Sequence, residues 1–145
     1  MSEIIHQKHN FVNKLLQDQN IKSILEYVES TKQNNLKLLE KNFSPISINL
    51  DLTTSCNYAC SHCIDMNILN NGIRFDYDKL LSSLDNLVKK GLKSVIIIGG
   101  GEPTVSPYFV NIVSFLKEKN IEIGIVSNGS RPDTINKILP ILEKK

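Results

Sequence analysis

Segments with strand-like and helix-like spacing alternate from residue 46 onward, and this alternation restricts the fold more than any other feature of the sequence. Residues 46–53 alternate apolar and polar side chains, as a strand with two different faces does. Residues 94–98 are a continuous apolar run, typical of a strand covered on both sides. Residues 121–127 form a third strand-like segment, and a helical pattern follows each strand. Three βα units joined by short links predict an α/β fold with a parallel sheet.

Local signals place the ends of the first two predicted helices. Asp76 is a suitable N-cap for the first helix, and residues 89–91, Lys-Lys-Gly, suit its C-terminus because cations and a left-handed glycine are favoured there. The second helix is expected to open with Ser106 as its N-cap and Pro107 at its first helical position.

The third predicted helix starts near Pro132, and Pro140 is expected to kink or end it. The chain of 145 residues then stops at Lys145. A complete eight-unit barrel takes about 250 residues. The sequence therefore predicts at most part of such a barrel, apparently truncated.

Residues 1–43 are predicted to form an N-terminal helical segment ahead of a core domain at residues 44–145. Its apolar positions follow the spacing of amphipathic helices: Phe11, Val12, Leu15 and Leu16, then Ile21, Ile24, Leu25 and Val28. We expect the segment to cover one side of the core. His6 and His9 are interpreted as surface residues rather than metal ligands.

Charge and hydropathy argue against several classes of protein. The 17 Lys and Arg residues and 15 Asp and Glu residues give a net charge of +2, too weak to predict a nucleic-acid or membrane surface. No apolar run approaches the roughly 20 residues of a membrane helix. The first ten residues lack the apolar stretch of a signal peptide, so we expect a cytoplasmic location.

All three cysteines, Cys56, Cys60 and Cys63, fall within eight residues directly after the first predicted strand. Because the cysteines are odd in number and clustered, the sequence excludes a secreted fold stabilised by disulfide bonds. A structural zinc site or a ferredoxin-type cluster would need four ligands, and His62 adjoins Cys63 and would point elsewhere. Three thiolates do fit a four-iron cluster with one iron left open to a small molecule. A zinc-binding or redox-sensing thiol protein is the alternative interpretation.

The other two predicted strands also end in distinctive loops. Residues 99–104 read Gly-Gly-Gly-Glu-Pro-Thr, where glycines permit close backbone approach and Pro103 biases Glu102 toward an extended conformation. This spacing matches neither a dinucleotide fingerprint nor a P-loop. Residues 127–130 read Ser-Asn-Gly-Ser. Taken alone, a glycine-rich segment of this kind is more often only a turn, and the Ser-Asn-Gly segment fits a turn and helix N-cap equally well.

The first predicted strand carries polar side chains on one face, namely Asn49, Asp51 and Thr53. A polar inner face suits a ligand-bearing lumen better than a dry core. The alternative interpretation is an edge strand with one solvent-exposed face.

Over roughly residues 46–130, these motifs resemble those of the radical S-adenosylmethionine (SAM) enzymes. The resemblance implies a partial TIM-like (β/α) barrel in which Cys56, Cys60 and Cys63 hold a [4Fe–4S] cluster. The open iron of that cluster would chelate the amino and carboxylate groups of SAM. Reductive cleavage of SAM would give methionine and a 5′-deoxyadenosyl radical, which abstracts hydrogen from a substrate that the sequence does not identify.

The resemblance also implies cofactor-binding roles in all three loops. The glycine-rich motif, matched by Gly100, Gly101, Glu102 and Pro103, would contact the amino group of SAM; His62 would lie near the adenine, and Ser127 and Asn128 near the ribose. No protein side chain is assigned to catalysis. The implied partners are SAM, a substrate, an electron donor (a reductase, flavodoxin or ferredoxin) and a chain that completes the barrel. A truncated, non-catalytic fragment that retains these loops is a further alternative.

Overall fold

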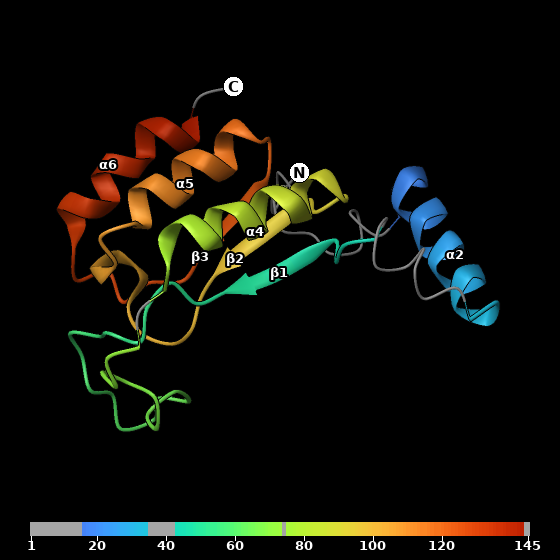
Figure 1. The fold of residues 1–145 in the computed structure, drawn as a ribbon. Helices are drawn as coiled ribbons and strands as arrows, with labels where there is room; N and C mark the ends of the chain where they lie inside the picture. Colours follow the sequence, from blue (N-terminus) through green and yellow to red (C-terminus); the bar gives the residue numbers. More distant parts are fainter. Residues whose placement is uncertain (1–15, 35–42, 74, 144–145) are drawn as a thin grey trace, which may run out of the picture.

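One parallel sheet organises the part of the chain that the computed structural model describes, which comprises residues 16–34, 43–73 and 75–143. Its strands are β1 (Ser47–Leu50), β2 (Ser94–Ile97) and β3 (Glu122–Ile125), in the order β1-β2-β3. The register places Ile48 opposite Val95, and Val95 opposite Ile123. The predicted α/β fold with three βα units, a partial TIM-like barrel, is confirmed (Figure 1).

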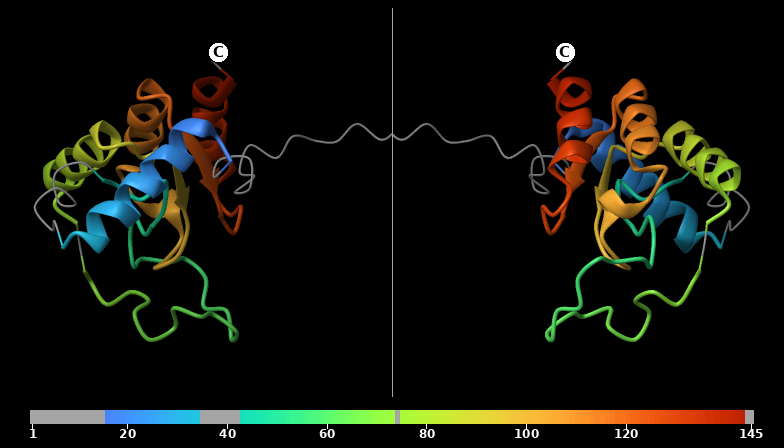
Figure 2. Two further views of the ribbon diagram at one scale, coloured as in Figure 1. Left: turned by 90° about the vertical axis from the view of Figure 1, so that its right-hand side faces the viewer. Right: turned by 90° about the vertical axis from the view of Figure 1, so that its left-hand side faces the viewer.

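Three helices cover the same face of this sheet: α4 (Tyr77–Lys89), α5 (Phe109–Glu118) and α6 (Pro132–Glu143) (Figures 1 and 2). The core lies between them and the sheet. Val95 and Ile97 of β2 and Leu116 of α5 have no exposed surface. Apolar burial of this kind is the main favourable contribution to folding.

The opposite face of the sheet carries no helix in the described part of the chain (Figure 1), and on β1 it is polar. Here the hydroxyls of Ser47 and Ser94 share a hydrogen bond of 2.7 Å, and Asn49 is exposed. Among the described residues, helices pack on one side of β2 only; on its other side Ser94 is buried and Ile96 is partly exposed. β1 is an edge strand, and its polar face is the uncovered one.

Helix α2 (Asp18–Lys32) confirms the predicted helical character of this part of the N-terminal segment. It does not cover the core, since Ile24 remains 40% exposed and Leu25 63% exposed. Helix α2 instead contacts the segment just before β1. Its Tyr27 ring packs edge to face on the Phe43 ring, with 5.6 Å between the ring centroids. The periodicity showed that α2 has an apolar face, but it carried no information about what contacts that face. Phe11, Val12, Leu15, His6 and His9 lie outside the described residues.

The predicted start of α4 is confirmed, since the Asp76 carboxylate accepts a hydrogen bond from the Lys79 amide at 3.1 Å. Gly91, just past the helix, has φ +114°. The predicted start of α5 is wrong. A 3₁₀ turn, η1 (Pro103–Val105), comes first, and α5 begins at Phe109. The Ser106 hydroxyl still accepts from the Tyr108 amide at 3.3 Å, in the turn between the two elements.

Pro140 was predicted to kink or end the third helix. The prediction that it ends the helix is wrong, since α6 continues to Glu143. Tertiary contacts hold its last turn. Ile141 and Leu142 pack against the core, and the Lys117 ammonium donates a hydrogen bond to the Leu142 carbonyl at 3.1 Å. These contacts compensate for the hydrogen bond that proline cannot donate.

A pair of leucine truncations tests this placement of the core. Leu116→Ala should lower the free energy of unfolding by about 3 kcal/mol, because it opens a cavity between α5 and the sheet. Leu139→Ala on α6 is the matched control, since Leu139 is 45% exposed; its cost should stay below about 1 kcal/mol. Urea denaturation measures both, and equal losses would contradict the described packing.

Candidate functional site

The three cysteines lie on the long connection between β1 and α4, which extends beyond the carboxyl ends of the strands (Figure 1). All three thiols are free; Cys56 and Cys63 are partly buried and Cys60 is exposed. The Cys63 amide donates to the Cys60 carbonyl at 3.1 Å, so these two residues share a turn.

The donor set fits an iron–sulfur cluster in its chemistry. Thiolates are the soft ligands that such clusters take, and here three reduced thiols occur on one accessible loop. The side chains are not gathered in advance: within residues 16–34, 43–73 and 75–143, no three His, Cys, Asp or Glu side chains converge on a point suitable for a metal ion. Binding would therefore have to draw the thiols together.

Two asparagines, neither of them a predicted site residue, close the base of the cysteine loop. The Asn70 side chain pairs with the main chain of Cys56, accepting from its amide at 2.9 Å and donating to its carbonyl at 3.3 Å. Asn71 accepts from the buried Thr54 hydroxyl at 2.8 Å. The Asn-Asn-Gly sequence at residues 70–72 is an ordinary turn signal, which shows why a turn occurs there but not which residue it contacts.

The glycine turn after β2 packs directly on the chain that leads into the cysteine loop. Gly100 has φ +68°, and a Cβ there would lie 2.6 Å from the Thr53 carbonyl oxygen. A Cβ on Gly101 would collide with the Ser55 carbonyl. The Glu102 amide donates to that same Ser55 carbonyl at 3.0 Å. Glycine is required here because two backbone segments lie in contact.

A carboxylate from the cysteine loop also reaches the glycine turn. Asp65 accepts a hydrogen bond from the Gly100 amide at 3.1 Å. The pKa of Asp51, at the end of β1, is raised by desolvation and by the nearby negative charge of Asp65. Asp51 was predicted on the polar face of the strand, but no sequence pattern indicates that Asp65 approaches it.

Glu102 joins the loop after β2 to the loop after β3. Its side chain is 3% exposed, and its carboxylate accepts from the Thr104 amide and hydroxyl, the Ser127 hydroxyl at 2.8 Å and the Asn128 amide at 2.7 Å. Burial alone would raise the pKa of Glu102. The hydrogen bonds from Thr104, Asn128 and Ser127 outweigh burial and hold that pKa below its usual 4.5, so the carboxylate stays ionised.

A third contact joins the cysteine loop to the loop after β3. The Asn57 side-chain Nδ2 donates to the Ser130 hydroxyl at 2.7 Å, and the Asn128 side-chain Nδ2 donates to the Asn57 Oδ1 at 3.2 Å. The three loops are thus linked in pairs.

The structure therefore brings most of the predicted site residues together. Glu102, Ser127 and Asn128 are in direct contact, and Gly100 and Gly101 lie against the segment just before Cys56. Pro103 is buried at the start of η1. His62 is exposed, and in the described part of the chain the structure gives it no hydrogen bond or ion pair.

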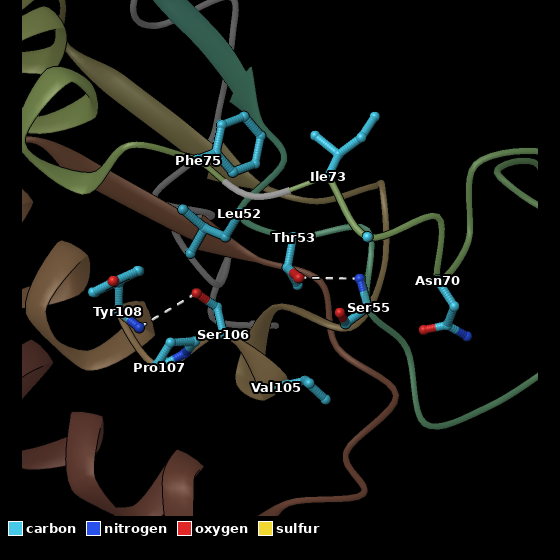
Figure 3. Close-up of a pocket in the computed structure, with 11 residues that line it drawn as sticks. Leu52, Thr53, Ser55, Asn70, Ile73, Phe75, Val105, Ser106, Pro107 and Tyr108 are labelled. Carbon is cyan, nitrogen blue, oxygen red and sulfur yellow. Dashed lines mark hydrogen bonds between the residues drawn. The ribbon is translucent and has the colours of Figure 1, made fainter.

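A cavity of about 400 Å³ lies beside the base of the cysteine loop (Figure 3). Thr53, Ser55 and Asn70 line one side, and Phe75 and Tyr108 are among the residues on the other. The Thr53 hydroxyl accepts from the Ser55 amide at 3.0 Å (Figure 3). The three cysteines are not among its lining residues.

No helix in the described ranges is both long and apolar enough to cross a bilayer.

Comparison with known proteins gives the family. The model of the radical SAM superfamily matches residues 50–144, which include all three loops. The chain is 34% identical over 83 residues to an S-adenosylmethionine-dependent nucleotide dehydratase from Selenomonas ruminantium, covering 57% of this chain and 30% of that protein. It is 35% identical over 82 residues to a tungsten-containing aldehyde ferredoxin oxidoreductase cofactor-modifying protein from Pyrococcus furiosus, covering 56% and 23%.

A mycofactocin maturase from Mycobacterium tuberculosis is 30% identical over 88 residues, covering 61% of this chain and 22% of the maturase. The matched segments thus span less than a third of each of these three relatives. The fold and the family match together define an α/β protein whose relatives are cofactor-dependent enzymes. The chain belongs to the radical SAM superfamily, whose members generally use a [4Fe–4S] cluster and SAM.

Substitution of Glu102 tests its role in linking the loops. Glu102→Gln should lower the free energy of unfolding at pH 7 by about 2 kcal/mol, because an amide cannot accept from every donor that meets the buried carboxylate. The native pKa is depressed, so the ionised group stabilises the fold above about pH 4.5, and this contribution is lost as the pH falls through the native pKa. The gap between wild type and variant should therefore close in acid.

Glu118→Gln, at an exposed position on α5, is the matched control and should change stability little at any pH. Denaturant titrations from pH 7 to well below pH 4.5, through the depressed native pKa, measure all three proteins. A gap between wild type and Glu102→Gln that stays constant across this range would contradict the role of the ionised carboxylate.

Proposed function

We propose that this chain is the cluster- and SAM-binding part of a radical SAM enzyme, with residues 44–145 as a partial core domain and residues 1–43 as a preceding helical segment. One observation carries the proposal: three free thiols extend from the end of β1 on a loop that is hydrogen-bonded to the loops after β2 and β3. Ligands of parallel α/β folds bind at this end of the sheet.

Cys56, Cys60 and Cys63 would hold a [4Fe–4S] cluster, with one iron left for the amino and carboxylate groups of SAM. When bound and reduced, the cluster supplies the electron that cleaves SAM to methionine and a 5′-deoxyadenosyl radical for hydrogen abstraction. The electron would come from a reductase, flavodoxin or ferredoxin. The exposure of Cys60 keeps this loop accessible to cluster delivery and to such a donor.

The glycine turn would receive the ammonium group of SAM. The carbonyl oxygens of Gly100 and Gly101 accept no hydrogen bond from the described residues, which leaves them available to a cationic donor. The Glu102 carboxylate is already occupied by its own four donors, so we assign it to holding the turn in place and to supplying a fixed negative charge beside the ammonium. Asn128 and Ser127 would lie toward the ribose, and His62, with its stackable ring, toward the adenine.

A second candidate function is a module that keeps the cluster and SAM sites but is non-catalytic by itself. It would convert substrate only when another chain completes the barrel. The uncovered face of the sheet favours it (Figure 1), because a radical reaction requires a site that excludes water. Release of 5′-deoxyadenosine by the reconstituted chain with SAM and a chemical reductant would support the enzyme. An intact cluster that binds SAM without releasing this product would support the module.

Single alanine substitutions of the cysteines test the ligand assignment. Cys56→Ala, Cys60→Ala and Cys63→Ala should each lose the cluster, because two thiolates rarely retain it. Ser61→Ala, an exposed position of the same loop, is the matched control and should keep the iron of the wild type. Iron and sulfide analysis after anaerobic reconstitution, with the visible absorption spectrum, provides the measurement.

Full iron content in all three cysteine variants would contradict the assignment. Tight stoichiometric zinc binding with no uptake of iron by the wild type would instead support a zinc or redox-sensing thiol protein.

A further inference from the structure

The main chain of Cys56 is held by one side chain from the far end of its loop, and we infer that Asn70 is a positioning residue for this proposed cluster ligand. The inference rests on the proposed cluster at the three cysteines. It concerns a residue outside the cysteine, glycine and Ser-Asn motifs.

Asn70 pairs with both polar main-chain atoms of Cys56. Its Oδ1 accepts from the Cys56 amide at 2.9 Å, and its Nδ2 donates to the Cys56 carbonyl at 3.3 Å. The main-chain amide of Asn70 also donates to the Thr54 carbonyl at 2.7 Å. Asn70 adopts this position with φ +56°, in the left-handed region that asparagine tolerates better than most residues. Three hydrogen bonds thus fix Asn70 to residues 54–56.

We call the two hydrogen bonds between the Asn70 side chain and the Cys56 main chain the side-chain clamp. This clamp also influences where the sulfur of Cys56 lies. The Tyr58 amide donates to the Cys56 Sγ at 3.5 Å, within the range of hydrogen bonds to sulfur. Because Asn70 holds the amide and the carbonyl of Cys56, the main chain of Cys56 is restrained, and the hydrogen bond from the Tyr58 amide then favours one position of the Sγ. Hydrogen bonds to ligand sulfurs are among the features that set the reduction potential of an iron–sulfur cluster.

The other two cysteines lack an equivalent side-chain clamp in the described residues. Cys60 is exposed, and the Cys63 amide donates only to the Cys60 carbonyl, within the same turn. Cys56 is therefore the thiol that is oriented in advance, and Cys60 and Cys63 move toward it when the cluster binds. Groups that orient ligands in this way commonly change metal affinity by about tenfold or more when they are removed.

Substitutions of Asn70 separate the side-chain clamp from the backbone conformation. Asn70→Gly keeps access to positive φ but removes both side-chain hydrogen bonds. Asn70→Asp keeps an acceptor for the Cys56 amide and tolerates the same φ. Asn67→Gly is the matched control, because Asn67 is an exposed asparagine of the same loop with no side-chain hydrogen bond among the described residues.

The first measurement uses the full chain without a cluster. Amide hydrogen exchange of Cys56, followed by NMR, should accelerate severalfold in Asn70→Gly, return toward wild type in Asn70→Asp, and stay unchanged in Asn67→Gly. The second uses the reconstituted protein. Asn70→Gly should lose iron to a chelator about tenfold faster than wild type, show a lower reduction potential, and show an altered EPR spectrum of the reduced cluster.

The outcomes distinguish the inference from the proposed function. A wild type that takes up no iron and sulfide would refute the proposed cluster, and the role of Asn70 toward it, even if Cys56 exchange still responds. A wild type with a normal cluster whose iron loss, potential and EPR spectrum match those of Asn70→Gly would overturn the inference alone. Faster exchange with an unchanged potential and spectrum would make Asn70 a structural residue only, which also overturns the positioning role.

Discussion

Parallel pairing of β1, β2 and β3 brings the three distinctive loops of this chain to one end of the sheet. Each strand runs in the same direction, and the register aligns Leu50 with Ile97 and Ile97 with Ile125, so the segments that follow them start at the same level. The helices pack on one face and bury the apolar side chains there. The uncovered face and the loop ends therefore remain accessible to a ligand, and every proposed cofactor contact depends on this arrangement.

Hydrogen bonds then make the three loops a connected unit. Asp65 joins the cysteine loop to the glycine turn, Glu102 joins the glycine turn to the loop after β3, and Asn57 joins that loop back to the cysteine loop. A single exposed hydrogen bond contributes only about 1 kcal/mol, so the buried and ionised Glu102 provides the strongest of these links. A ligand that orders one loop should consequently order the others, which suits a site in which a cluster and a nucleoside cofactor bind side by side.

The order of elements was predictable because hydrophobic periodicity and capping are local. Asp76 at the start of α4 and Gly91 beyond its end are examples. Features that depend on distant contacts were not predictable. Pro140 lies within α6 because Ile141 and Leu142 reach the core, and among the described residues the apolar face of α2 packs on Phe43 rather than on the core. At the site, the sequence motifs singled out the cysteines and Glu102 as candidates, whereas the contacts of Asn57, Asp65 and Asn70 cross loops and leave no short-range pattern.

The central claim is that three thiolates bind a cluster and leave one iron for SAM. Electron–nuclear double resonance on the reduced, reconstituted chain tests this most directly, with SAM carrying ¹⁵N in its amino group. The account predicts a hyperfine coupling from that nitrogen, as expected when the amino group binds the open iron. An intact, EPR-active cluster that shows no such coupling at saturating SAM would contradict it.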